Sequence, residues 1–409
     1  MKQSKRTAIG LLVITLLGLL MFVTAPKAVT MVQTTTATDL VKLPNFGMAS
    51  YIVTLVALIF MVLATAYSAW LTLAKNAKTP RWVTIGFGLA LVVDVLVVLF
   101  AGKTLTITSL LQGSLALAVP LIFGSLAGVL SERVGVVNIA IEGQLLAGAF
   151  ISALVASLTD NLFAGLIGAM VAGALVSWVL AVFSIKYIVD QIIVGVVLNV
   201  LMQGLTNFFF TTVMSNDLAI FNQPPRFDKI AIPLLSQIPV IGPVLFYQTL
   251  IVYLMYLAVA GVWVLLFKTR WGLRVRAVGE YPIAADTVGI KVYRTTYISV
   301  IMGGALAGLG GAFFTLGQVG AFGKEMSNGA GYIALAALIF GRWNPIYAAF
   351  AALLFGFAEN LRQLLGVIGS SVPSEFLEML PFALTVIAVA GLVGKVTGPA
   401  ASGKAYIKS

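Results

Sequence analysis

The stretch that decides the fold is KTRWGLRVRAVGEYPIAADTVGIKVYRT, Lys268 to Thr295, a polar interruption in a chain made almost entirely of apolar runs. Its six basic residues are Lys268, Arg270, Arg274, Arg276, Lys291 and Arg294. No other interior segment of the sequence is so basic. Membrane proteins collect Lys and Arg in cytoplasmic loops, because carrying these charges across the bilayer is unfavourable. We therefore expect this basic loop to lie in the cytoplasm, and the topology follows by counting outward from it.

The composition is that of a polytopic membrane protein. Of the 409 residues 60% are hydrophobic and 10% charged, and the mean hydropathy is +1.05. The net charge of +11 does not indicate nucleic-acid binding, because Lys and Arg lie at the ends of apolar runs, where they determine topology and contact anionic membrane lipid. The chain has no Cys and no His, which excludes thiol nucleophiles, disulfides, Cys/His zinc sites and imidazole catalysis. We expect no catalytic residue, no metal and no cofactor.

Apolar runs follow one another along the chain, and all but one are long enough to cross a bilayer. They cover residues 8–25, 48–74, 82–101, 107–130, 136–158, 162–184, 188–213, 246–267, 297–318, 331–340, 346–368 and 380–394. The sequence predicts an all-α integral membrane protein with about 11–12 transmembrane helices, including broken or re-entrant segments, because the run at 331–340 is about half a bilayer long. Twelve crossings place both termini in the cytoplasm with most of the 25 basic residues. The first run also fits a cleavable signal peptide, so removal of residues 1–25 stays open.

The longest outer segment, residues 214–245, is rich in proline. Pro224, Pro225, Pro233, Pro239 and Pro243 alternate there with apolar residues. Proline cannot continue a helix interior, so we expect an extended or broken-helix cap. The cap either docks another protein or packs over the helix ends.

Amide side chains form a polar stripe at membrane depth. Asn199, Gln203 and Asn207 are spaced by four residues and share one helix face. In hydrocarbon they need partners, so the stripe faces another helix or a water-filled path, and the two alternatives are equally supported. We add Asn138 and Glu142, four apart and expected on one helix face, as further candidates for a substrate path. For Glu142 the structural alternative is that the carboxylate caps a helix or pairs internally with Arg133.

Two further features lie in apolar runs. Asp94 is an isolated acidic residue and therefore a functional candidate. Gly304 and Gly308 form a GxxxG motif that lets helix backbones approach closely, which indicates a pivot or a dimer seam.

A phosphate-binding loop would let the chain power transport itself. The nearest match is GPAASGKA, Gly398 to Ala405, which ends in Ala where the motif needs Ser or Thr and lies in a short tail. We reject it. An ion gradient or a separate ATPase must then drive any transport cycle.

Three segments resemble a known family. They are LSERVGVVNIAIEGQLLAGAF (Leu130 to Phe150), IPLLSQIPVIGPVLFYQ (Ile232 to Gln248) and RAVGEYPIAADTVGIKV (Arg276 to Val292). They look like permease subunits of bacterial ATP-binding cassette (ABC) importers, and most like the nucleoside permeases in the group that also holds branched-chain amino acid and simple sugar permeases. The resemblance covers residues 107–394.

The resemblance implies a function and partners. The chain is expected to carry nucleosides across the bacterial cytoplasmic membrane while a separate ABC ATPase hydrolyses ATP, so that it is not itself an enzyme. A second, homologous permease would complete a heterodimer, and an extracellular lipid-anchored solute-binding protein would deliver the nucleoside. The alternatives are a permease for simple sugars or branched-chain amino acids, an ion-gradient-driven secondary transporter that uses Asp94 and the stripe, and a structural scaffold. Residues 1–105 would form an N-terminal membrane extension of about three spans, 106–395 the permease core and 396–409 a cytoplasmic tail.

The basic loop also matches, in part, the element that contacts the ATPase in such importers. Ala284, Ala285 and Gly289 fit its EAAxxxG spacing, whereas Ile283 replaces the Glu and Tyr281 replaces a usual Asn. We expect a short coupling helix over Gly279 to Gly289, with Pro282 in its first turn and Gly289 at its end. The coupling candidates are Gly279, Glu280, Pro282, Ala284, Ala285, Asp286 and Gly289. The alternative is a solvated loop whose charges serve only topology.

Overall fold

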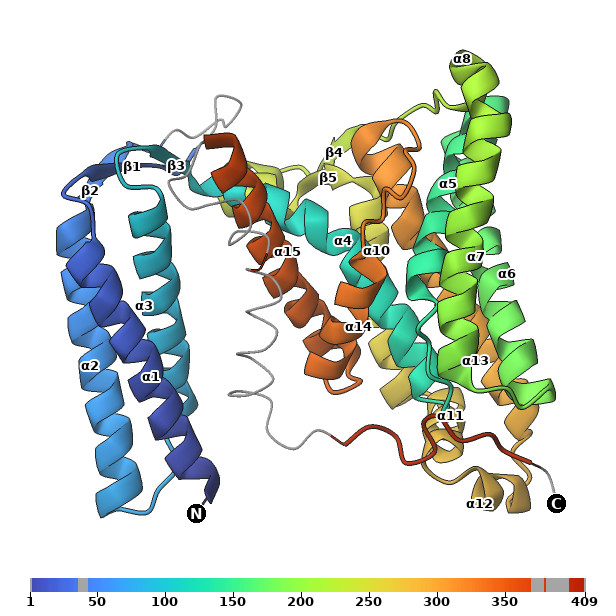
Figure 1. Ribbon diagram of the computed structural model, residues 1–409, viewed down its shortest axis with the longest axis horizontal. Helices are drawn as coiled ribbons and strands as arrows, with labels where there is room; N and C mark the ends of the chain where they lie inside the picture. Colours follow the sequence, from blue (N-terminus) through green and yellow to red (C-terminus); the bar gives the residue numbers. More distant parts are fainter. Residues whose placement is uncertain (1, 36–42, 369–378, 380–396, 408–409) are drawn as a thin grey trace. The chain divides into compact units, whose positions relative to one another are not determined.

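The computed structural model describes residues 2–35, 43–368, 379 and 397–407 (Figure 1). It is 73% helix and 5% strand. Within these residues ten helices are long and apolar enough to cross a membrane, and Ala330–Phe340 is a shorter apolar helix. The predicted all-α membrane fold is confirmed. The predicted run at 380–394 lies outside the described residues.

The long helices follow the apolar runs (Figure 1). They are α1 Lys2–Thr24, α2 Ser50–Ala74, α3 Arg81–Leu99, α4 Ile107–Glu132, α5 Ile141–Thr159, α6 Leu162–Ala181, α7 Gln191–Thr212, α10 Leu250–Lys268, α13 Val292–Ala312 and α15 Pro345–Ile368. The shorter helices are α8 Leu218–Phe221, α9 Ile241–Leu245, α11 Arg270–Glu280, α12 Pro282–Thr287 and α14 Ala330–Phe340. Two π-helical turns, η1 Val182–Lys186 and η4 Phe313–Val319, extend α6 and α13.

Two compact units make up the chain. The first comprises residues 1–112, 232–246 and 360–395, and the second comprises 113–231, 247–359 and 396–409. In the first unit α1, α2 and α3 pack around a cluster that includes Met61 and Phe87. The same unit contains a small sheet of order β2-β1-β3. Its central strand β1 (Val29–Gln33) is antiparallel to β2 (Phe46–Ala49), both between α1 and α2, and parallel to β3 (Thr104–Thr106), which follows α3. We did not expect this sheet from the sequence.

Asp94 lies in α3 and is fully buried in the first unit. Neither of its carboxyl oxygens has a hydrogen-bond partner among the described residues. Burial of a carboxyl group without a partner is costly, and the cost is least for the uncharged form. The hypothesis that Asp94 couples transport to an ion stays a prediction.

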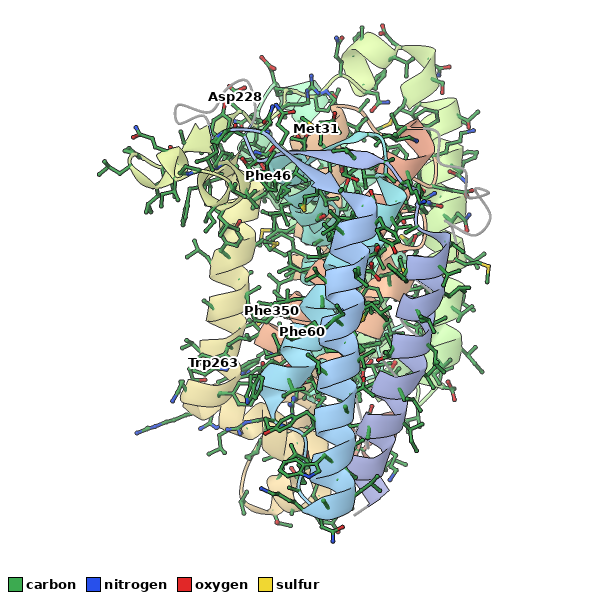
Figure 2. All side chains as sticks on the ribbon, turned by 90° about the vertical axis from the view of Figure 1, so that its left-hand side faces the viewer. Met31, Phe46, Phe60, Asp228, Trp263 and Phe350 are labelled. Atoms are coloured by element: carbon green, nitrogen blue, oxygen red, sulfur yellow. The ribbon has the colours of Figure 1, made fainter. Side chains whose placement is uncertain are left out.

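Membrane-facing surfaces are apolar, as the composition requires. On α2 the side chains of Ile52 and Leu63 are 60% and 64% exposed. Phe60, labelled in Figure 2, is 41% exposed although its ring lies close to Gly86 of α3. On α10 Leu257 is 68% exposed. A helix with such a face lowers its free energy by contact with lipid tails or another membrane helix.

The centre of the second unit is a close packing of α5, α6 and α13. A Cβ atom on Gly304 or Gly308 of α13 would overlap the backbone oxygen of Gly173 or Ala169 of α6. The two helices therefore approach backbone to backbone, as the GxxxG motif predicts. Both glycines are buried within the chain, so the interpretation of the motif as a dimer seam is wrong.

Residues 214–231 of the outer segment are broken into short elements, as the prolines predict. In the second unit these are a 3-10 turn, η2 (Met214–Asn216), then α8, and the strand β4 (Lys229–Ala231), which pairs antiparallel with β5 (Tyr247–Thr249). In the first unit residues 232–246 contain the 3-10 turn η3 (Leu235–Gln237) and α9.

Candidate solute path and coupling surface

The turn before α5 positions Asn138, one of the residues predicted to line the solute path. Gly135 has a φ of +96°, which favours glycine, and α5 begins only at Ile141. Asn138 and Glu142 therefore do not share a helix face, and that prediction is wrong. The Asn138 amide is fully buried and exchanges hydrogen bonds of 3.1 and 3.2 Å with Gln144. Its side chain holds the turn against α5.

Glu142 caps another helix. Its Oε1 accepts hydrogen bonds from the Ser327 hydroxyl (2.7 Å) and the Gly329 N–H (2.8 Å), and its Oε2 accepts one from the Gly331 N–H (2.6 Å). These donors lie at the N-terminus of α14, where N–H groups lack helical partners and a negative charge is favourable.

Of the two structural alternatives for Glu142, the cap is therefore confirmed and the pair with Arg133 is wrong. Arg133 donates instead to the Trp343 carbonyl oxygen at 2.9 Å. Burial lowers the pKa of Arg133, and the nearby Glu280 carboxylate opposes that shift. Arg133, which directly follows α4, therefore connects the end of that helix to the turn at Trp343.

Asn199 of α7 joins three elements. Its Oδ1 accepts from the Gly143 N–H (2.8 Å), and its Nδ2 donates to the Ile139 carbonyl oxygen (2.9 Å) and the Tyr332 hydroxyl (3.2 Å). The side chain is 6% exposed and connects α7 to the start of α5 and to α14. All its hydrogen-bonding groups are occupied by the protein.

Gln203 and Asn207 hold one carboxylate. Both donate hydrogen bonds to Glu325, and the Asn207 Nδ2 lies 3.1 Å from its Oε1. Both amides are donors, so they favour the charged form of the carboxylate. Gln203 and Glu325 are exposed in this chain, whereas the Asn207 Oδ1 is buried without a partner among the described residues.

The amide stripe of α7 therefore lies alongside residues 325–332, the segment that leads into and begins α14. Asn199 and Asn207 are eight residues apart, about 12 Å along α7. They contact Tyr332 and Glu325 in the opposite order, so residues 325–332 run antiparallel to α7. The structure thus brings together Asn199, Gln203, Asn207 and Glu142 around one segment. Asn138 lies apart in its own network.

Sequence reasoning missed Glu325, Tyr332 and Gln144. Glu325 carries a usable signal, because it is an acidic residue between two apolar runs. Its φ of +55° is unusual for a residue other than glycine. The local geometry of residues 320–329 holds its carboxylate against α7, and no spacing rule in the sequence reports that contact.

Replacing Glu142 by Ala will lower the stability of the permease. Three donors at the start of α14 then lose a charged acceptor inside the protein, which costs about 3 kcal/mol or more. Thermal unfolding of the purified permease in detergent measures the loss. Glu142→Gln, which keeps one acceptor oxygen, should lose less, and Asp228→Ala, at an exposed position, should lose little. Equal stability of Glu142→Ala and wild type would contradict the capping role.

The basic loop forms two helices, α11 and α12, rather than one. Gly279 and Glu280 end α11, and the short helix begins at Pro282, which is its first residue as predicted. The wider expected range of Gly279 to Gly289 is therefore wrong at its start. A Cβ atom on Gly279 would overlap the carbonyl oxygen of Arg133, which explains the glycine as a close-packing residue.

Gly289 ends α12 as predicted. It has a φ of +84°, and the Ile290 N–H donates to the Ala285 carbonyl oxygen at 3.0 Å, a helix-ending bond typical of glycine in this position. Ala285 is only 3% exposed, so it packs inside the chain and its side chain does not lie on the free surface. The free surface of α12 carries Ala284, Ile283 (54% exposed) and Val288 (76% exposed).

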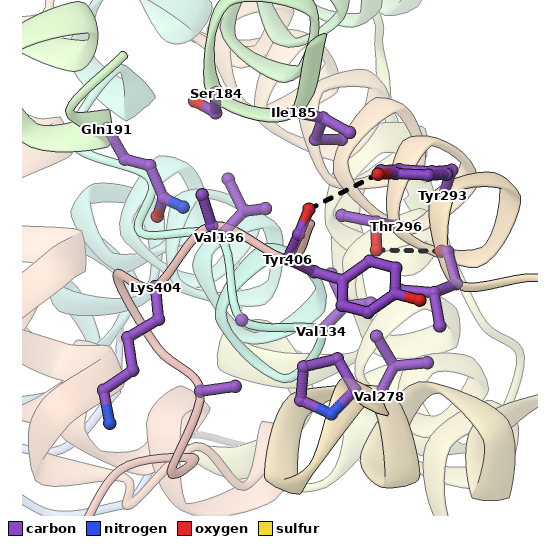
Figure 3. Close-up of a pocket in the computed structure, with 15 residues that line it drawn as sticks. Val134, Val136, Ser184, Ile185, Gln191, Val278, Tyr293, Thr296, Lys404 and Tyr406 are labelled. Carbon is purple, nitrogen blue, oxygen red and sulfur yellow. Dashed lines mark hydrogen bonds between the residues drawn. The ribbon is translucent and has the colours of Figure 1, made fainter. Parts of the chain in front are cut away.

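The C-terminal segment contacts both short helices. The Ala401 N–H donates to the Gly279 carbonyl oxygen (2.9 Å), and the Gly403 N–H donates to that of Gly135 (3.0 Å). Figure 3 shows Tyr406 beside Tyr293, whose hydroxyl donates to the Tyr406 carbonyl oxygen at 3.5 Å. The Tyr406 hydroxyl in turn hydrogen-bonds Asp286 of α12. This tail therefore holds α11 and α12 against the turn before α5.

The molecule is a multi-pass membrane protein with a half-length helix, a buried polar network around it and a surface-exposed short helix at one end of the second unit (Figure 1). Sequence comparison assigns the class. The chain belongs to the family described as branched-chain amino acid transport system / permease component, whose model matches residues 110–389.

Three relatives illustrate the family. The guanosine ABC transporter permease protein NupQ of Bacillus subtilis is 40% identical over 317 residues, 73% of this chain and 96% of NupQ. The nucleoside ABC transporter permease protein NupC of Lactococcus lactis is 40% identical over 314 residues, 74% of this chain and 98% of NupC. The putative glucose ABC transporter permease protein TsgC13 of Haloferax volcanii is 34% identical over 253 residues, 62% of this chain and 76% of TsgC13.

Bacillus subtilis also has the guanosine ABC transporter permease protein NupP, which is 28% identical to this chain. Lactococcus lactis has the nucleoside ABC transporter permease protein NupB, which is 26% identical. No solved structure shows significant similarity to this chain.

Proposed function

We propose that this protein is the membrane-spanning permease subunit of an ATP-driven importer that carries nucleosides, with ATP hydrolysis supplied by a separate subunit. The observation that carries the proposal is 40% identity to two nucleoside permease proteins over nearly their whole length. Many apolar spans and the surface-exposed α12 fit a subunit that provides the path and is driven by another protein.

Uptake of a radiolabelled nucleoside panel tests the function. A bacterial strain that lacks this chain, but retains the other subunits of the transporter, should regain nucleoside uptake when the chain is restored. The uptake should persist after an uncoupler as long as ATP remains. If uptake stops when the uncoupler removes the membrane potential while ATP stays at its normal level, the result would support a secondary transporter instead. Absence of any transported solute would support a structural scaffold.

A sugar permease is the second candidate, because the relative TsgC13 is named as a putative glucose permease. Glucose and branched-chain amino acids therefore belong in the same uptake panel. Transport of glucose without nucleoside transport would overturn the proposed substrate while leaving the importer class intact.

Three partners follow from this proposal. A second permease is supported by the paired relatives in two bacteria, because one member of each pair is 40% identical to this chain and the other 28% or 26%. An ABC ATPase is supported by the ABC transporter names of these relatives. An extracellular lipid-anchored solute-binding protein rests on the family resemblance alone. Co-purification from native membranes tests all three.

The ATPase contact is proposed at α12. Its exposed side chains are apolar at Ile283, Ala284 and Val288, and this free face fits insertion into a groove. Ala285, Asp286 and Pro282 support it from within through packing and the contact of Asp286 with the tail. The proposed location of the permease is the bacterial cytoplasmic membrane, with α12 and both termini on the cytoplasmic side. The domain division at residues 105 and 395 remains part of the same proposal.

Replacing Gln203 by Leu tests whether the stripe borders the solute path. Gln203 is the exposed member of the stripe, and its amide, which donates to Glu325, lies at the surface that a passing solute would contact. We expect about a fivefold loss of uptake, because one hydrogen bond contributes about 1 kcal/mol. Asn199→Leu is the comparison, since Asn199 is buried and its loss should lower the amount of protein instead. Normal uptake by Gln203→Leu at normal protein levels would remove Gln203 from the path.

A further inference from the structure

The carboxylate of Glu325 lies at membrane depth. Its partner Asn207 is 16 residues after Gln191, about 24 Å along a span, Gln191–Asn216, that is about 39 Å long. The hydrocarbon core of a bilayer is about 30 Å thick, so Asn207 lies inside it when the span is centred. Glu325 is nevertheless exposed on the surface of this chain.

A charged group in that position cannot face lipid without a large cost. No basic side chain neutralises Glu325 through a contact that the described residues show, and the neighbouring Lys324 lies over the Phe210 ring, 5.6 Å from its centre. The surface that carries Glu325 therefore faces either water or another protein subunit.

The Glu325 carboxylate has acceptor positions to spare. A carboxylate offers about four lone-pair positions, and the amides of Gln203 and Asn207 occupy two. The Asn207 Oδ1 is buried, so it is not offered to a solute. The two free positions on the carboxylate fit a solute that presents adjacent hydroxyl groups.

An aromatic ring lies on the same segment. Tyr332 is 50% exposed, and its hydroxyl is fixed by the Asn199 amide. A fixed, half-exposed ring provides a stacking surface for a planar base. The two features lie at opposite ends of residues 325–332, which run along α7.

We propose that Glu325 is a specificity-determining residue of the solute path, which accepts hydrogen bonds from the ribose diol of a nucleoside while Tyr332 contacts the base. This inference rests on the proposed nucleoside function. It differs from the amide stripe predicted from the sequence, because the stripe here positions the carboxylate and the carboxylate contacts the solute.

Glu325→Gln in the complete importer tests the inference. The probes are guanosine and 2′,3′-dideoxyguanosine, which lacks the diol. We expect the variant to raise the KM for guanosine about tenfold, the loss expected when a charged hydrogen bond is removed, with the maximal rate within about twofold of wild type. The KM for the dideoxy analogue should not change. Asp228→Asn, which removes a negative charge at an exposed position in residues 113–231, is the matched control and should change neither value.

The ratio of the two KM values decides the outcome even if the variant accumulates to a lower level, since both solutes are measured on the same membranes. An unchanged ratio would overturn the inference. Loss of the second permease on purification of Glu325→Gln would assign Glu325 to a subunit interface and also overturn it. A wild-type importer that carries no nucleoside would refute the proposed function itself.

Discussion

Ile283→Asp will reduce ATP-dependent uptake at least about tenfold while the permease remains folded in the membrane. Ile283 is 54% exposed on α12 and makes part of the apolar face proposed to enter a groove of the ATPase. An aspartate there must lose its hydration in an apolar contact, and each 1.4 kcal/mol of lost affinity is a factor of ten. The measurements are uptake in liposomes that contain the reconstituted importer and co-purification of the ATPase with the permease.

Ile283→Leu is the matched control for this prediction, because it keeps an apolar side chain of similar size at the same position. It should retain both uptake and the bound ATPase. Substitution of Ala285 is a poor test of coupling, since Ala285 is 3% exposed and a larger side chain would disturb the chain's own packing. Full uptake by Ile283→Asp with a normal ATPase content would leave the basic loop only its topological role.

Gly308→Leu will prevent accumulation of the folded permease. A Cβ atom at Gly308 would overlap the carbonyl oxygen of Ala169, so α13 and α6 would have to separate. Backbone contact between these helices forms the centre of the second unit, and overpacking it costs about 3 kcal/mol or more. The amount of permease in detergent extracts and its thermal unfolding measure the effect.

Gly261→Leu provides the control for the glycine prediction. Gly261 lies in the membrane-spanning helix α10, and a Cβ atom there would meet no atom within 4 Å. The same change of residue type should therefore leave the amount of folded protein near that of wild type. Equal losses in both variants would mean that leucine, rather than the close approach of α13 to α6, causes the defect.

Much of the fold could be predicted because lipid imposes a strict local rule. Every backbone polar group in hydrocarbon needs an internal partner, so an apolar run of sufficient length must be a helix. The short run at 331–340 gave α14 for the same reason, and the special residues Pro282 and Gly289 gave the ends of α12. These features depend on residues near one another in sequence.

The candidate site was less predictable, because its contacts join distant segments. A cap or a pair with Arg133, nine residues away, was the structural alternative for Glu142, and the cap it makes uses donors 185 to 189 residues further along the chain. The stripe was recognised on α7, but its partner Glu325 lies in a loop whose backbone follows no helical period. Spacing rules report which residues share a face and say nothing about what that face contacts.

The sequence by itself determined that this chain crosses the membrane many times, where its helices lie, and that Gly304 and Gly308 serve close packing. These features have local physical causes, namely the length of each apolar run, the absence of a side chain at glycine and the fixed φ of proline. Only the tertiary structure decided that the glycine seam is internal, that Ala285 is covered while Ile283 is free, and that the amides of α7 hold a carboxylate. Each of these depends on which helices pack together, and that choice is a property of the whole assembled chain.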